Sequence, residues 1–92
     1  MRFQLVKGQP LKGGAMFITA GSIVDDVSGV FRVTYAPDRS HVGEALPGGW
    51  IVPVEAVPLD QTAYSAMRAR YPNRQIITHN DALAGITRTA DL

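Results

Sequence analysis

The sequence contains no cysteine, so disulfide bridges, thiolate-ligated zinc and cysteine-held iron–sulfur clusters are excluded. Charged residues make up only 18% of the chain, below the roughly 25% that is usual for soluble domains, and the net charge is +1. No apolar run approaches the roughly 20 residues that a membrane-spanning helix needs. We therefore expect a protein that is made in the cytoplasm and has no membrane contact.

Histidine is also scarce, which leaves few ligands for a metal ion. His41 and His79 are far apart, and neither has a second histidine two to four residues away. Asp38 and Glu44 flank His41 only loosely, whereas a metal site needs three or four convergent ligands. Solvated histidines are the better interpretation, and we expect no metal.

The usual arrangements of catalytic residues are absent as well. Ser40 precedes His41 directly, and adjacent side chains on an extended chain point in opposite directions, so the imidazole would not activate that hydroxyl. Asp25 and Asp26 diverge for the same reason and are expected to end a strand. The glycines of residues 8–14 lack the Gly-Lys-Ser/Thr ending of a phosphate-binding loop. The sequence therefore predicts a protein that is not an enzyme and binds no cofactor or small-molecule substrate.

The chain does contain enough hydrophobic residues for the core of one small domain. Of its 92 residues, 46% are hydrophobic, too many for a disordered chain. The charges are unevenly spread: residues 1–24 carry three basic and no acidic side chains, residues 25–60 six acidic and two basic, and residues 61–92 four basic and two acidic. Such a pattern orients a protein partner more than it attracts a polyanion.

Short runs of alternating or β-branched residues, separated by glycine and proline, predict a chain of short strands. The expected strands cover residues 2–7, 15–19, 23–24, 30–35, 50–54 and 75–78. One helix is expected over residues 61–71, with Asp60 as its N-cap. Together these predict one β-rich domain over residues 1–78, of class α+β: a small antiparallel sheet or an SH3-like, partly open barrel with one short helix.

Two elements of this domain have a predicted side-chain pattern. In residues 30–35, Phe31, Val33 and Tyr35 share the face expected to point into the core, whereas Arg32 is expected to be exposed. In the helix, the apolar residues follow helical spacing. They are Tyr64, Met67 and Tyr71.

The long segment of residues 36–49 is expected to be a mobile surface loop or one held by a partner, because prolines and glycines interrupt it. Its apolar residues Val42 and Leu46 are therefore candidates for an interface. Trp50 follows this loop and has two interpretations, a core residue or an interface anchor.

Residues 79–92 have few apolar side chains for their length and contain Gly85, which disfavours a helix. The three are Leu83, Ile86 and Leu92. Burying three aliphatic side chains returns only about 5–9 kcal/mol, less than the cost of ordering the segment. We therefore predict an arm that orders against a neighbouring subunit, and a tail packed along its own sheet remains the alternative.

The only basic cluster consists of Arg68, Arg70 and Arg74. Residues 68 and 70 lie about 200° apart on a helix, so the cluster does not form one face. The sequence thus favours a solvated helix surface over contact with nucleic acid.

Two stretches of the chain carry a resemblance to a known group of proteins. Phe3 and Leu5 lie in an N-terminal strand, a glycine-rich break follows, and residues 17–25 read Phe-Ile-Thr-Ala-Gly-Ser-Ile-Val-Asp. This pattern, with the helical segment of residues 58–71, resembles short structural or accessory proteins encoded in phage and prophage structural gene clusters. The resemblance implies a role in the virion and carries over no catalytic residue.

These observations predict a non-enzymatic structural or adaptor subunit that docks onto a larger protein assembly, such as a phage capsid or tail. Its partner is expected to be another protein or further copies of the chain. The alternative is a free-standing SH3-like binding module that contacts nucleic acid through its basic residues.

Overall fold

Six short strands and one helix follow one another in the computed structural model, which describes residues 1–11 and 16–78. The elements are β1 (Arg2–Gln4), β2 (Gln9–Pro10), β3 (Phe17–Ile18), β4 (Ile23–Val27), β5 (Val30–Tyr35), β6 (Val57–Pro58) and α1 (Gln61–Arg70). Every strand pair is antiparallel. The strands form a four-stranded sheet in the order β5-β4-β1-β6 and a separate two-stranded sheet, β2-β3.

This architecture confirms the expected α+β, mostly β class with one short helix. The described strands close no barrel. The predicted arm, with Leu83, Ile86 and Leu92, lies outside the described residues.

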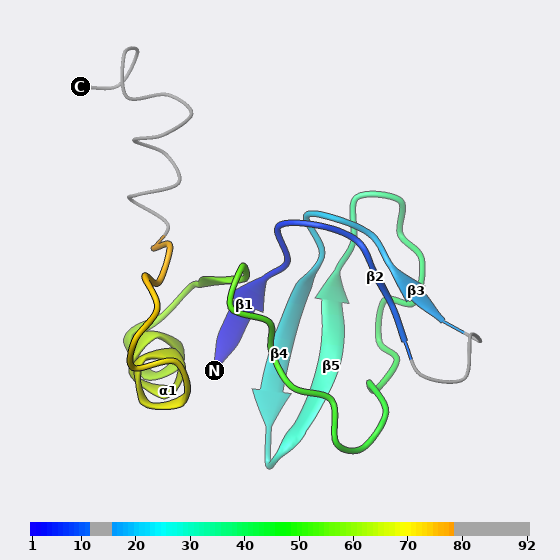
Figure 1. Cartoon of the computed structure of the whole chain (residues 1–92). Helices are drawn as coiled ribbons and strands as arrows, with labels where there is room; N and C mark the ends of the chain where they lie inside the picture. The colour runs from blue at the N-terminus through cyan, green and yellow to red at the C-terminus, as the bar shows by residue number, and fades with distance from the viewer. Residues whose placement is uncertain (12–15, 79–92) are drawn as a thin grey trace.

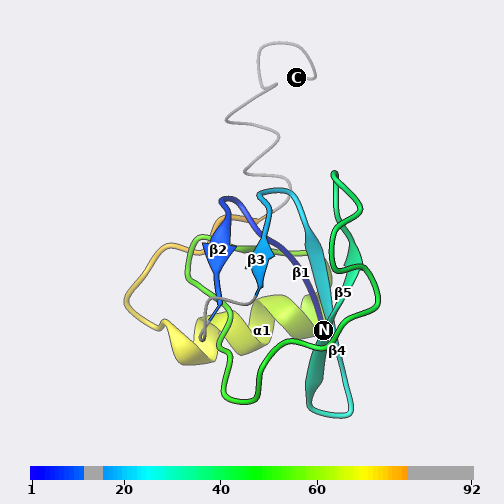
Figure 2. The ribbon, with the colours of Figure 1, turned by 90° about the vertical axis from the view of Figure 1, so that its right-hand side faces the viewer.

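The chain bends between the two sheets at a hydrogen-bonded turn. The Leu5 amide donates to the Ser22 carbonyl and the Gly21 amide donates to the Leu5 carbonyl, both at 2.8 Å. Gly21 has a φ of 87°, a conformation that glycine adopts without steric cost. Figure 1 shows α1 and the β2–β3 hairpin at opposite ends of the main sheet, and Figure 2 shows both on one side of β4 and β5.

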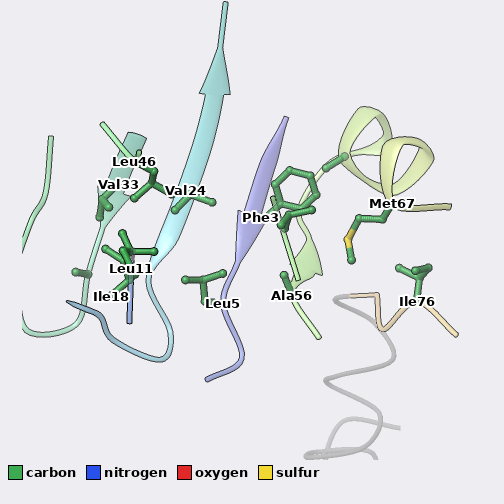
Figure 3. Packing of buried hydrophobic residues seen from close by; sticks show 13 residues of the cluster. Phe3, Leu5, Leu11, Ile18, Val24, Val33, Leu46, Ala56, Met67 and Ile76 are labelled. Carbon is green, nitrogen blue, oxygen red and sulfur yellow. The ribbon is translucent and has the colours of Figure 1, made fainter. Parts of the chain in front are cut away.

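The core follows a row of residues that face one another across the main sheet. Phe3 in β1 pairs with Val24 in β4 and with Pro58 in β6, and Val24 pairs with Val33 in β5. All four side chains are buried. In Figure 3 Phe3 lies towards Met67 of the helix, and Leu11 and Ile18 of the hairpin lie on the side of Val24 and Val33.

The further buried hydrophobic residues of this cluster come from every part of the described chain. They are Leu5, Leu11, Ile18, Ala36, Leu46, Val52, Ala56, Ala63, Met67 and Ile76. Because the hairpin and the helix each contribute to one continuous cluster, residues 1–11 and 16–78 share a single core.

The helix agrees closely with the sequence prediction. The Asp60 carboxylate accepts a hydrogen bond of 2.7 Å from the Ala63 amide, so Asp60 is the N-cap. Ala63 and Met67 are buried, four residues apart on one face. The helix ends one residue earlier than expected because Tyr71 leaves the helical conformation.

In β5 the predicted alternation holds from Val30 to Thr34 and fails at Tyr35. Val33 is buried, Phe31 is half-buried and Arg32 is exposed, as expected. Tyr35, however, is 51% exposed. A bulge shifts the register, so that Val33 pairs with Val24 but Tyr35 pairs with the adjacent residue Ile23. Because adjacent strand residues face opposite sides of a sheet, Tyr35 lies on the side opposite to Val33.

Three further expectations about strands are wrong. Asp25 and Asp26 do not end a strand but lie within β4, which continues to the Ser28–Gly29 turn. Residues 50–54 form no strand: Pro53 lacks an N–H, and its carbonyl accepts from the Ala56 amide in a turn. Residues 75–78 are irregular and form no strand.

The long segment after β5 packs on its own domain. The Val33 amide donates to the Glu44 carbonyl at 3.0 Å, and the Gly43 and Leu46 amides donate to β5 carbonyls at 2.7 and 2.8 Å. Residues 43–46 therefore cover the β5 edge, and Leu46 is buried with 6% of its surface exposed. This corrects the expectation that the whole of residues 36–49 is a loop free of the domain.

Replacing Phe3 by alanine is expected to destabilise the domain by about 3–5 kcal/mol, because the ring fills the centre of the cross-strand row. The matched control is Phe17→Ala, for which we expect a loss of about 1 kcal/mol or less, because half of that side chain is exposed. Urea unfolding monitored by circular dichroism gives both values. Equal losses would contradict the assignment of Phe3 to the core and Phe17 to the surface.

Candidate functional site

A cluster of polar side chains joins the turn before β4 to the segment after β5. The Asp38 carboxylate accepts hydrogen bonds from the Ser40 hydroxyl at 2.7 Å, the Ser40 amide at 3.0 Å and the Thr19 hydroxyl at 3.4 Å. Thr19 is also 3.1 Å from the hydroxyl of the buried Ser22. The hydrogen bonds from the Ser40 side chain and backbone lower the pKa of Asp38 below its ordinary value.

The same segment holds backbone conformations that ordinary residues rarely adopt. Arg39 and His41 both have a φ of 63°, in the left-handed region. His41 Nδ1 lies 3.0 Å from Glu44 Oε2, and Arg32 donates to the Gly43 carbonyl at 3.1 Å. These contacts hold residues 38–44 in place beside β5.

The serine and the histidine of the polar cluster have separate hydrogen-bond partners. Ser40 donates its hydroxyl proton to Asp38, and His41 contacts Glu44, so the serine and histidine do not act on each other. The described residues also contain no group of three side chains that could hold a metal ion. Thus the cluster serves to fix the loop that covers the β5 edge.

A second candidate surface lies on the outer side of the β2–β3 hairpin. Pro10 pairs with Phe17 and Gln9 pairs with Ile18, so Phe17 and Pro10 share one face while Ile18 points into the core. Phe17 is 50% exposed, although its ring lies so close to Gly8 that an added Cβ there would be 2.5 Å from it.

Two exposed residues precede β2 in the chain. Val6 is 50% exposed, and Lys7 is exposed and makes no ion pair in the described part of the chain. We call Val6, Lys7, Pro10 and Phe17 the hairpin patch. It combines an exposed aromatic ring with aliphatic surface and one lysine, and of these the aromatic ring is the type of residue that is enriched at protein interfaces.

The structure separates the residues that the sequence proposed for an interface. Leu46 packs in the core, which corrects its assignment to a docking surface. Trp50 is half-buried, its ring 5.0 Å from that of Phe31 in an edge-on contact at the margin of the core. Val42 is exposed beside the polar cluster and stays a candidate.

Sequence reasoning missed Phe17. Phe17 and Ile18 are adjacent in a two-residue strand, and a strand this short has no alternation from which the buried side can be read. Two residues could have indicated the exposed position of Phe17. Pro10 is suited to an edge strand, and Gly8 permits the close approach of an aromatic ring.

The three candidate basic residues are exposed at the C-terminal end of α1 and just after it. Arg68 Nη1 donates to the Arg74 carbonyl at 3.0 Å, and the Arg70 guanidinium lies 5.8 Å from the centre of the Tyr71 ring. Arg68 and Arg74 are thus brought together, while Arg70 points to another side of the helix.

No protein-family model, curated protein or solved structure matches the chain. Within residues 1–11 and 16–78, no helix has the length and apolar character needed to cross a membrane.

The lowered pKa of Asp38 predicts an effect of pH on the loop. A carboxylate whose pKa is lower in the folded state than in the unfolded state stabilises the fold at every pH above its unfolded-state pKa. This stabilisation is lost as the pH falls through the folded-state pKa. At neutral pH, Asp38→Asn should therefore loosen the loop and speed trypsin cleavage after Arg39.

The matched control is Asp26→Asn, because the Asp26 side chain makes no hydrogen bond or ion pair in the described structure. Cleavage after Arg39 is followed by mass spectrometry. Equal rates for the wild type and Asp38→Asn would show that the hydrogen bonds to Asp38 do not hold the loop.

Proposed function

We propose that this protein is a non-enzymatic structural or adaptor subunit that docks onto another protein of a larger assembly through its hairpin patch. The observation that carries the proposal is the half-exposed Phe17 on a hairpin whose opposite side is anchored in the core. Exposed aromatic residues of this kind are common anchors of protein interfaces.

The anchoring of the hairpin makes the patch suitable for binding. Leu11 and Ile18 are buried beneath it, with 5% and 1% of their surfaces exposed. Because the strands are already held in place, ordering them on association costs little conformational entropy. A surface that is ordered before binding therefore binds more tightly than a flexible surface that makes the same contacts.

The partner proposed is a protein surface with an apolar pocket for Phe17 and an acidic rim for Lys7. Neither residue is needed to close the core, and Lys7 forms no ion pair among the described residues. The resemblance of residues 17–25 and 58–71 to phage structural and accessory proteins supports an assembly of the virion type. Further copies of this chain are one source of such a surface.

Photo-crosslinking in the organism of origin tests the docking surface. We expect a photoreactive phenylalanine analogue at position 17 to form one crosslink to one defined protein or to a second copy of the chain. The control position is Val30, which is 43% exposed but lies in β5, outside the hairpin patch. No crosslink at position 17, or the same products from both positions, would contradict the proposal.

The binding energy should be concentrated at the aromatic ring. Once the crosslinked protein is known, Phe17→Ala should weaken the interaction by about 2 kcal/mol or more, the value typical of an interface anchor. Isothermal titration calorimetry measures the change. The variant must keep the wild-type circular dichroism spectrum, so that a loss of affinity is separated from a loss of folding.

A further inference from the structure

The outer edge of β5 is occupied by the protein's own chain. β5 is the longest of the described strands, and residues 43–46 run antiparallel beside it. We call residues 43–46 the covering segment. The amide and the carbonyl of Val33 both form hydrogen bonds with it, and the Phe31 carbonyl accepts a third. A neighbouring antiparallel strand would use the same groups, so the covering segment takes the place of such a strand.

The sequence of β5 is suited to pair with a copy of itself. Residues 30–35 read Val-Phe-Arg-Val-Thr-Tyr, so that every residue except the arginine is β-branched or aromatic, and there is no glycine or proline. In an antiparallel pair centred on Val33, each Val33 amide would donate to the other Val33 carbonyl, and Arg32 would face Thr34 of the second copy. This register opposes no like charges, whereas a pair centred on Arg32 would place two arginines opposite each other.

The covering segment is fixed at both of its ends. At its end Leu46 is buried in the core. At its start Gly43 has a φ of 91°, and its amide donates to the Val33 carbonyl at 2.7 Å. A Cβ added to Gly43 would meet no atom within 4 Å, so the position requires glycine for its backbone conformation and not for space. Gly43 is therefore the residue at which the segment can be released with the least disturbance of the core.

From these contacts we infer that the covering segment is an autoinhibitory device, which keeps β5 from pairing with β5 of a second copy of this chain. While the segment is in place, the outward amide and carbonyl of Val33 are satisfied within one molecule. When it is displaced, both groups lose their partners, and strand addition by a second copy satisfies them again. The hairpin patch takes no part in this contact.

The test compares two proline substitutions by sedimentation velocity. In Gly43→Pro the new residue has no N–H and cannot adopt a positive φ, so the segment should leave β5 and the protein should self-associate as its concentration rises. The control is Gly48→Pro, in the turn closed by the hydrogen bond from the Trp50 amide to the Pro47 carbonyl. Proline is favoured at this first central position, and Gly49 keeps its φ of 84°. The control should keep the association state of the wild type.

Hydrogen exchange shows whether β5 is the strand that pairs. In dilute Gly43→Pro the Val33 amide should exchange at least tenfold faster than in the wild type. It should become protected again at the concentrations at which the variant self-associates. A folded Gly43→Pro that does not self-associate, or that self-associates while the Val33 amide stays unprotected, would overturn the inference. Equal self-association of the two proline variants would also overturn it.

Circular dichroism checks that Gly43→Pro is folded. If it is not, Gly43→Ala takes its place, because alanine keeps the N–H and fits the space but is strained at a φ of 91°. The same changes in association and in Val33 exchange are then expected, with smaller amplitude. A folded Gly43→Ala with the association state and the Val33 exchange rate of the wild type would overturn the inference.

Discussion

The hydrogen-bonded pair between Leu5 and the Gly21–Ser22 turn decides where the β2–β3 hairpin lies. It continues the pairing of β1 with β4 past the end of β1, and the left-handed conformation of Gly21 lets the chain bend there. The bend brings Leu11 and Ile18 into the core and leaves Phe17 outside. These two backbone hydrogen bonds thus set the position of the hairpin, which completes the core and carries the hairpin patch.

A second constraint acts at the edges of the main sheet. Residues 43–46 cover β5 with backbone hydrogen bonds, and β6 is two residues long and contains Pro58, which has no N–H to offer. Exposed strand edges invite pairing with other chains, and short or proline-containing edges discourage it. Contact with a partner is therefore expected through side chains and not through strand pairing. The hydrogen bonds of Asp38 and the contact between His41 and Glu44 help to hold the segment that covers the β5 edge.

Much of the fold could be predicted because its signals are local. The Asp60 cap and the helical spacing of Met67 located α1 to within one residue, and the alternation of Phe31 and Val33 gave the buried face of β5. The features that were missed depend on contacts distant in sequence. The bulge that turns Tyr35 outward, the burial of Leu46 against β5 and the choice between Phe17 and Ile18 are all decided by which strand lies alongside.

The most direct test of this account is methyl and aromatic proton NMR of the isolated protein. If the hairpin folds onto the sheet, nuclear Overhauser effects should connect the methyl groups of Leu11 and Ile18 with those of Val24 and Val33, and the Phe17 ring should show none to these valines. The absence of contacts from Ile18 to the sheet, or contacts from Phe17 in their place, would contradict the account.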